Sequence, residues 1–270
     1  MSSRVSWPAL RIVVAAVYLF MLGPIVITAA VSFNKEQRSY FPPRGFSLHW
    51  WHQAFTAQWL QPLGFSLRLA LLAAIVSALL GVPIAFALRY RSFPGKSALE
   101  AVTVGPLILP SLVTGIALMQ SLTLAGLGHW MGFGALLIGY VVISLPFSVR
   151  TVAISLTGMP GHVEAAAASL GAGPLSVLRH ITLPLVAPGI LAGMIFAFIH
   201  SFDDVNLSLF LARPGATPIT IQILNFLEFG FSPTLAAVSV LSLIVPIGAV
   251  ALFGRWAGLG SFLFPESGHG

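Results

Sequence analysis

Hydrophobic residues gather in long runs separated by short polar stretches, which is the pattern of a chain that crosses a bilayer several times. A helix needs about 20 apolar residues to span roughly 30 Å of hydrocarbon, and six runs are this long. Several contain a proline, which kinks a helix and is tolerated where neighbouring helices satisfy the freed carbonyl groups. We therefore expect an all-α transmembrane bundle forming one domain over residues 1–270. The expected spans are 8–31, 63–88, 99–122, 131–156, 185–211 and 234–256.

The composition strengthens this expectation and removes other classes. Hydrophobic residues make up 57% of the chain and charged residues only 7%, far from the usage of soluble domains. The net charge of +6 comes from basic residues in the gaps between runs, so it indicates membrane orientation rather than nucleic-acid binding. The chain has no cysteine, which excludes disulfides and thiolate metal sites.

The basic residues also predict an orientation. The run from Ile12 to Val31 is longer than the about 7–15 apolar residues of a signal peptide, so we expect a retained first helix. With the N-terminus inside, the inner loops hold twice as many Lys and Arg residues as the outer loops, which predicts that both termini are cytoplasmic. The inner residues are Arg4, Arg11, Arg89, Arg91, Lys96, Arg150, Arg179 and Arg255, and the outer ones are Lys35, Arg38, Arg44 and Arg213.

The predicted outer loop at residues 32–62 is rich in aromatic residues. His49 and His52 flank two tryptophans, and Trp59 follows. The two histidines lack an evident third metal ligand, so we interpret the stretch as a short helix in the aromatic belt of the membrane surface.

Residues 163–184, which we call the elbow, interrupt the apolar pattern in a predicted cytoplasmic loop. Alanines favour a helix over 163–170, Gly171 and Gly173 favour its end, and Pro174 suits the first position of a second helix over 174–181. Leu175, Leu178 and Ile181 would give that second helix an apolar face, with Pro184 opening the next span. Such a face fits a groove on a soluble partner.

The elbow resembles the EAA loop of permease subunits of bacterial ATP-binding-cassette (ABC) importers, binding-protein-dependent importers of type I. The family pattern is EAA, three residues, Gly, nine residues, Ile, one residue and Leu-Pro. One position departs from it: counting back from Gly171, the glutamate falls on Ala165, and Glu164 stands one residue earlier. Whether Glu164 pairs with a basic residue of the ATPase therefore stays open. The resemblance implies that the elbow docks on a cytoplasmic ATPase through Glu164, Ala165, Ala166, Gly171, Leu175, Leu178, Ile181, Leu183 and Pro184.

The resemblance extends from about residue 46 to residue 256. The stretch SFDDVNLSLFL is most similar to the second permease subunit of spermidine/putrescine-type importers, and the other matching stretches are FSLHWWHQAF, SLRLALLAAIVSALLGVPIAFAL, PLILPSLVTGIALM and LPFSVRTV. It implies a six-helix permease in the bacterial inner membrane that forms half of a translocation path for a small cationic solute such as a polyamine. It also implies three kinds of partner: a second, homologous permease, two ATPase subunits that bind ATP and Mg²⁺, and an extracytoplasmic binding protein. No cofactor is implied for this chain itself.

Ionisable residues inside the fifth predicted span are candidates for the path. His200, Asp203 and Asp204 lie three and four residues apart, near one face of a helix. Charged groups at membrane depth mark a pathway or a pairing. An aspartate could line the path and attract a cation, or it could hold the helix to a neighbour through Arg68, a serine or backbone groups. Other solutes, including opines, amino-acid-like amines, ferric iron and thiamine, stay open.

Two other functions fit parts of the sequence. A proton-coupled secondary transporter could use His200, Asp203 and Asp204 as a relay, and a scaffold or channel subunit would not pump. Neither explains the spacing of the elbow. The GKS at residues 95–97 lacks the earlier glycine of a phosphate-binding loop, and the sequence contains no HExxH or GxSxG motif. We therefore expect no catalytic residues and no metal site in this chain.

Overall fold

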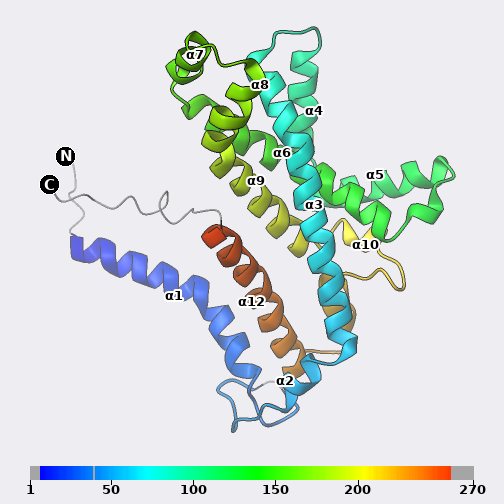
Figure 1. Ribbon diagram of the computed structural model, residues 1–270. Coiled ribbons are helices and arrows are strands. Elements are labelled where there is room, and N and C mark those ends of the chain that lie inside the picture. The colour runs from blue at the N-terminus through cyan, green and yellow to red at the C-terminus, as the bar shows by residue number, and fades with distance from the viewer. Residues whose placement is uncertain (1–6, 39, 257–270) are drawn as a thin grey trace, which may run out of the picture. The chain divides into compact units, whose positions relative to one another are not determined.

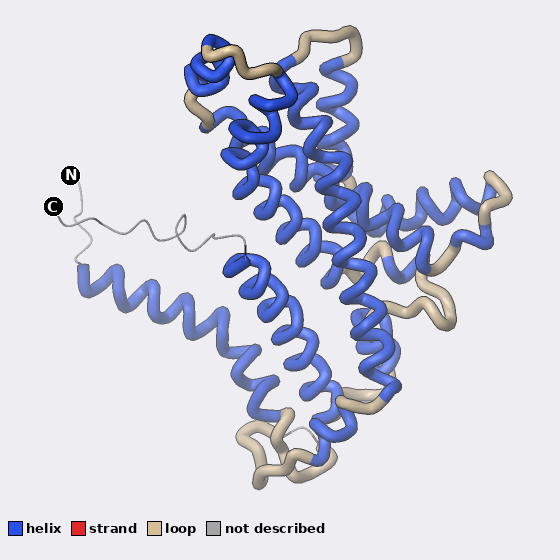
Figure 2. The backbone as a smooth tube through the Cα atoms, viewed as in Figure 1, coloured by secondary structure: helices blue, strands red, loops and turns tan. Residues whose placement is uncertain are grey.

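The computed structural model describes residues 7–38 and 40–256, and within them helices and loops form the whole fold without a strand (Figure 2). Arg4 and the side chain of Arg255, both used above to predict orientation, lie outside this description. The helices follow one another as α1 (Trp7–Val31), α2 (His49–Ala54), α3 (Ala57–Tyr90), α4 (Lys96–Ile108), α5 (Ser111–Leu124), η1 (Gly128–Trp130), α6 (Phe133–Gly158), α7 (Gly161–Ser169), α8 (Pro174–Val177), η2 (Leu178–Thr182), α9 (Leu183–Asp203), α10 (Ser208–Leu211), α11 (Ile219–Leu227) and α12 (Pro233–Trp256) (Figure 1).

The chain divides into two compact units. The first comprises Met1–Gln61 with Gln222–Val245, and the second comprises Pro62–Ile221 with Pro246–Gly270. The second unit contains the elbow and the acidic residues of the fifth predicted span, so it holds both candidate sites.

The first unit is fastened by polar and aromatic contacts around α2. The indole Nε1 of Trp50 donates to the carbonyl oxygen of Asn34 at 2.6 Å, and Asn34 is fully buried. Thr234 at the start of α12 donates its hydroxyl to Gln53 Oε1 at 2.8 Å. The aromatic loop residues therefore serve packing within this unit.

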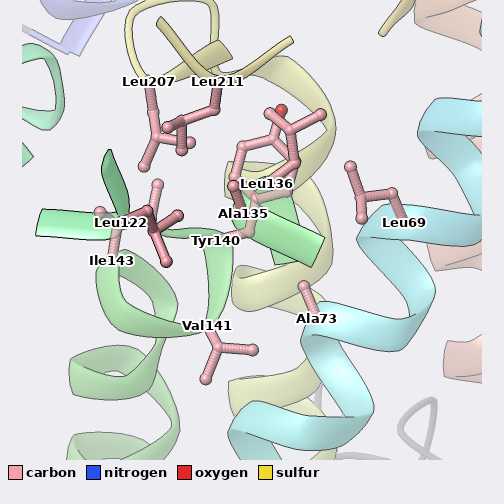
Figure 3. Packing of buried hydrophobic residues seen from close by; sticks show 10 residues of the cluster. All are labelled: Leu69, Ala73, Leu122, Ala135, Leu136, Tyr140, Val141, Ile143, Leu207 and Leu211. Carbon is pink, nitrogen blue, oxygen red and sulfur yellow. The ribbon is translucent and has the colours of Figure 1, made fainter. Parts of the chain in front are cut away.

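The core of the second unit is centred on α6. Figure 3 shows Leu136 and Tyr140 of α6 facing Leu207 and Leu211, with Leu69 of α3 on the other side. All five side chains are at most 2% exposed. Their burial fixes α6 between α3 and the short segment that follows α9.

Small residues let α6 and α9 approach closely, and Figure 1 shows the two helices side by side. A Cβ atom added to Gly193 of α9 would lie 2.9 Å from Cα of Ser148, and one added to Gly189 would lie 2.8 Å from the carbonyl oxygen of Thr151. Distances of this kind leave no room for a side chain, so the two glycines set the separation of these helices.

Two predicted spans differ from the observed helices. The third, expected over residues 99–122, is two helices, α4 and α5, bent by 113°. The bend lies at Leu109, which is extended. The next residue is Pro110, and a proline lacks an N–H and disfavours helical geometry in the residue before it. The fifth, expected to reach residue 211, ends at Asp203, where Asp204 is extended, and α10 forms a separate turn.

By length and composition, five helical segments of the described chain could cross a membrane, and the bent pair α4 and α5 would make a sixth. The expected all-α transmembrane fold is therefore confirmed. The five segments are Leu10–Val31, Ala57–Tyr90, Phe133–Gly158, Pro174–Asp203 and Pro233–Leu252.

Candidate functional site

The elbow folds as the predicted helix, turn and helix. Helix α7 ends at Ser169, and Gly171 then takes a φ of +86°, a conformation that costs glycine little and other residues more. Gly173 is extended and Pro174 occupies the first turn of α8. The local sequence therefore determines the bend directly.

The sequence analysis expected the second helix of the elbow to be separate from the next span, but the two are continuous. Pro174–Asp203 is one helical segment of 30 residues. Within it η2 is a π-helix, in which Leu183 donates its N–H to the carbonyl of Leu178, five residues earlier. A π-turn widens the helix just before Pro184, whose ring would otherwise meet the carbonyl of the preceding turn. The bend is thus connected rigidly to α9.

The apolar face of the elbow is narrower than its spacing predicts. Leu175 is 74% exposed, while Leu178 and Ile181 are half-buried. Leu170, which the sequence analysis did not single out, is 89% exposed at the end of α7. Two leucines on either side of the Gly171 turn therefore form the exposed apolar tip of the elbow.

The remaining motif residues surround this tip. Ala165 and Ala166 are exposed on α7, Pro184 is exposed, and Leu183 is half-buried. Glu164 points back into its own chain, where its Oε1 accepts a hydrogen bond from the Thr182 hydroxyl at 2.6 Å.

A second candidate site is an open pocket of about 620 Å³ at the end of α9. It brings together Asp203 and His200, which the sequence analysis singled out, with side chains from α5, α6 and the segment after α9. Its lining residues are Ser111, Phe147, Phe196, Ile199, His200, Asp203, Asp204, Val205 and Asn206. We call it the Asp203 pocket.

Aromatic rings form one wall of the Asp203 pocket. Phe147 stacks on Phe196 with ring centroids 6.1 Å apart, and its ring meets His200 edge-on at 5.4 Å. The side-chain amide of Asn206 donates a hydrogen bond to Oγ of Ser111, the first residue of α5, at 3.4 Å. A carboxylate beside aromatic faces is a setting that attracts organic cations.

The two adjacent aspartates have different environments. Asp204 is 8% exposed, and its Oδ1 accepts the backbone N–H of Leu207 at 2.8 Å. Its carbonyl oxygen accepts the hydroxyl of Ser208 at 3.0 Å. Asp203 is exposed to the pocket. Asp204 thus shapes the turn into α10, and Asp203 is the carboxylate that faces the pocket.

Of the structural alternatives for these charges, the contact with a backbone group is found at Asp204. In the described part of the chain, no hydrogen bond joins His200 to either aspartate, and Arg68 makes no ion pair with them. His200 instead meets the ring of Phe147 edge-on.

Sequence reasoning missed the partners of the residues it selected. Phe147 and Ser111 come to the pocket from other helices, and Tyr90 and Thr182 contact Glu164. Only the Leu109–Pro110 step gave a local signal, since a proline after an extended residue breaks a helix and places Ser111 at the start of α5.

Comparison with known proteins identifies the class of this fold. A chain of a bacterial ABC transporter involved in the import of the acidic polysaccharide alginate superposes with a TM-score of 0.68 at 15% identity, covering 94% of this chain and 96% of that one. A chain of the inward-facing MetNI methionine ABC transporter gives 0.56 at 18% identity, covering 76% and 96%. These similarities show a shared fold.

The sequence relatives are permease proteins of transport systems as well. The spermidine/putrescine transport system permease protein PotC of Escherichia coli K12 is 32% identical over 243 residues, covering 86% of this chain and 87% of that protein. PotC of Haemophilus influenzae is 30% identical over 238 residues, with 87% and 91% covered. The putrescine transport system permease protein PotI of Escherichia coli K12 is 29% identical over 245 residues, with 88% and 85% covered.

The family model described as "Binding-protein-dependent transport system inner membrane component" matches residues 77–258, a range that includes the elbow and the Asp203 pocket. The resemblance noted from the elbow is thereby confirmed, and the main interpretation holds over a secondary transporter. This chain belongs to the binding-protein-dependent transport system inner membrane components, the permease subunits of ABC importers.

Proposed function

We propose that this permease imports a small organic cation of the polyamine class through the Asp203 pocket. The observation that carries the proposal is the exposed carboxylate of Asp203 beside the rings of Phe147 and Phe196. A polyamine is a chain of ammonium groups joined by short alkyl segments. Carboxylate oxygens attract its charges, and ring faces accept both ammonium and alkyl groups. The PotC and PotI relatives are named for spermidine and putrescine, which supports the same class.

The pocket is large enough for such a solute but is not enclosed. Its volume of about 620 Å³ lies in the usual range of ligand sites, roughly 300–1,000 Å³. It is lined from α5, α6, α9 and the segment after α9. An open wall is expected of a chain that supplies half of a translocation path, with the other half coming from a second permease that is a homologue of this chain.

The elbow is proposed to dock on a cytoplasmic ATPase subunit. Leu170 and Leu175 present two exposed apolar side chains on a short helical bend, which suits a groove on a partner. The complete importer would contain two permeases, two ATPase subunits that hold ATP and Mg²⁺, and an extracytoplasmic binding protein that delivers the solute. The alginate transporter above was solved with its periplasmic protein, which supports the last of these partners.

The proposed mechanism is a shift between two states of the membrane helices. ATP binding brings the ATPase subunits together, and the elbow moves with them. Because α8, η2 and α9 form one helical segment, this movement reaches Asp203 at its far end. The solute site then faces alternately outward and inward, as in any equilibrium biased by differential contacts. The elbow and both termini are cytoplasmic in this arrangement, and the protein lies in the bacterial inner membrane.

The decisive experiment is reconstitution of the complex purified through this chain. We expect an ATPase to co-purify, and ATP inside proteoliposomes carrying the binding protein to drive uptake of labelled spermidine. Uptake should stop with vanadate and should not follow an imposed pH gradient. Vanadate-insensitive uptake driven by that gradient would instead support a secondary transporter, and a complex without any ATPase would remove the import assignment.

The docking surface is tested by a matched pair of leucines. Leu170 and Leu124 are both 89% exposed, but Leu124 ends α5, away from the elbow. Leu170→Ser should reduce the amount of ATPase that co-purifies, and Leu124→Ser should not. Equal retention in both variants would remove Leu170 from the docking surface.

A further inference from the structure

Glu164 is the meeting point of three separate elements. Its Oε1 accepts the Thr182 hydroxyl at 2.6 Å and the Tyr90 hydroxyl at 3.0 Å, and its Oε2 lies 3.2 Å from the same Tyr90 hydroxyl. Tyr90 is the last residue of α3, Glu164 lies in the first half of α7, and Thr182 ends η2. One carboxylate therefore ties the first elbow helix to the end of one span and to the start of another.

The contact is buried on the Thr182 side and open to its surroundings on the Tyr90 side, where Tyr90 is 45% exposed. Thr182 is 1% exposed, and Glu164 is half-buried. Hydrogen bonds from neutral donors to a carboxylate are charge-assisted and stronger than those between neutral groups. Tyr90 is 74 residues from Glu164 in the sequence, so its hydrogen bond joins two helices that are not neighbours along the chain.

The π-helix contributes to this arrangement. Thr182 lies in η2, where its hydroxyl is also within 3.5 Å of the carbonyl of Val177, five residues earlier. The widened turn brings the threonine to the side facing α7, and the same turn accommodates Pro184. The irregularity in the helix thus has a geometric consequence at Glu164.

The direction of the Glu164 side chain differs from what an ATPase contact would need. Its polar contacts in the described chain are with two hydroxyl groups of its own fold. The exposed tip of the elbow is formed instead by Leu170 and Leu175, on either side of the Gly171 turn. Within the elbow, Leu170 and Leu175 are therefore exposed to a partner, whereas Glu164 binds residues of its own chain.

We propose that Tyr90 and Thr182 are positioning residues for energy coupling: they hold Glu164 so that α7 moves together with α3 and α9. This rests on the proposed function, because it gives the contact a role in transmitting movement from an ATPase. Without the three-way contact, α7 would turn about Gly171 while the long helix stays in place. ATP would still be hydrolysed, but less solute would move for each ATP.

The first measurement is the number of spermidine molecules imported per ATP hydrolysed by the full complex in proteoliposomes. Tyr90→Phe and Thr182→Val each remove one hydroxyl and keep the side-chain size. We expect each to lower the ratio by about threefold to tenfold, the effect of losing one hydrogen bond of ordinary strength. ATPase retention should stay unchanged. The double variant Tyr90→Phe/Glu164→Gln should be no worse than Glu164→Gln, and Tyr18→Phe in α1 is the matched control.

The second measurement follows the contact directly and does not need transport. The natural sequence has no cysteine, so Ala168→Cys in α7 and Ser92→Cys after α3 provide the two thiols for spin labels. We expect a narrow distance distribution between the labels in the complex. Tyr90→Phe and Thr182→Val should broaden it, and Tyr18→Phe should leave it narrow.

The outcomes separate this inference from the proposed function. Wild-type coupling ratios and narrow distributions in both hydroxyl variants, with loss of the ATPase in Glu164→Gln, would overturn it and assign Glu164 to the ATPase interface. If the unchanged complex holds no ATPase and imports no spermidine, the proposed function fails. In that case an unbroadened distribution in Tyr90→Phe would overturn the contact as well.

Discussion

The Oδ1 of Asp204 accepts the backbone N–H of Leu207 at 2.8 Å, while the carboxylate one residue earlier, that of Asp203, is exposed to an open pocket. Two adjacent residues of the same type thus have unlike surroundings. One completes a turn between α9 and α10, and the other faces the open pocket.

We expect the amide substitutions of these two residues to behave differently. Asp203→Asn keeps the shape and removes the charge, so uptake of labelled spermidine should fall while assembly and basal ATP hydrolysis survive. Asp204→Asn keeps an oxygen that can accept the Leu207 N–H, so its effect should be smaller. Unchanged uptake in both variants would remove these aspartates from the path.

The structural role of Asp204 is tested by removing the acceptor altogether. Asp204→Ala leaves a buried N–H of Leu207 without a partner, which costs about 1–2 kcal/mol. Thermal unfolding of the purified complex should therefore begin at a lower temperature than in Asp203→Ala. Equal unfolding temperatures would show that the turn does not depend on this bond.

The aromatic wall of the pocket predicts an effect on affinity. Phe147→Leu keeps an apolar side chain and removes the ring that contacts Phe196 and His200. Loss of a cation–π contact of about 1 kcal/mol should raise the spermidine concentration for half-maximal uptake by about fivefold. Ile199→Val, a change at the same pocket without a ring, is the control, and an equal shift in both variants would contradict the prediction.

The close approach of α6 and α9 predicts a loss of stability. Gly193→Ala would place a methyl group 2.9 Å from Cα of Ser148, so the helices must separate or shift, at a cost of about 1–3 kcal/mol. Gly105→Ala in α4 is the matched control, because nothing lies within 4 Å of the added carbon. Thermal unfolding in detergent should distinguish the two, and similar curves would mean that α9 adjusts without strain.

The turn of the elbow offers a second matched pair of glycines. An added methyl group meets nothing within 4 Å at Gly171 or at Gly173, but Gly171 alone has a positive φ, of +86°. Gly171→Ala should strain the bend by about 1–2 kcal/mol and reduce uptake per ATP. Gly173→Ala should be close to neutral, and a reversed order would show that the bend is set by something other than backbone geometry.

Local chemistry made the helices and the bend of the elbow predictable. Apolar runs of sufficient length became helices because a membrane leaves the backbone few other choices. Gly171 and Pro174 act through their own conformational preferences, so the sequence predicted where the turn lies. The family resemblance rested on Gly171 together with Ile181, Leu183 and Pro184.

Other features depend on contacts that no local pattern contains. Hydropathy averaged over residues 99–122 conceals the break at Leu109, although the following proline was visible. The bond between Tyr90 and Glu164 joins residues 74 positions apart, and neither position looks unusual by itself. The difference between Asp203 and Asp204 arises only from where α10 begins.

The uninterrupted course of the chain from Pro174 to Asp203 has a mechanical meaning. At about 1.5 Å per residue, 30 residues make a rod roughly 45 Å long, with the elbow at one end and the pocket carboxylate at the other. A tilt of about 10° around its middle would carry each end by about 4 Å, in opposite directions, comparable to the width of an alkylammonium group. In the proposed mechanism, a small rotation imposed at the elbow would therefore be sufficient to open or close a passage at the other end of this helical segment.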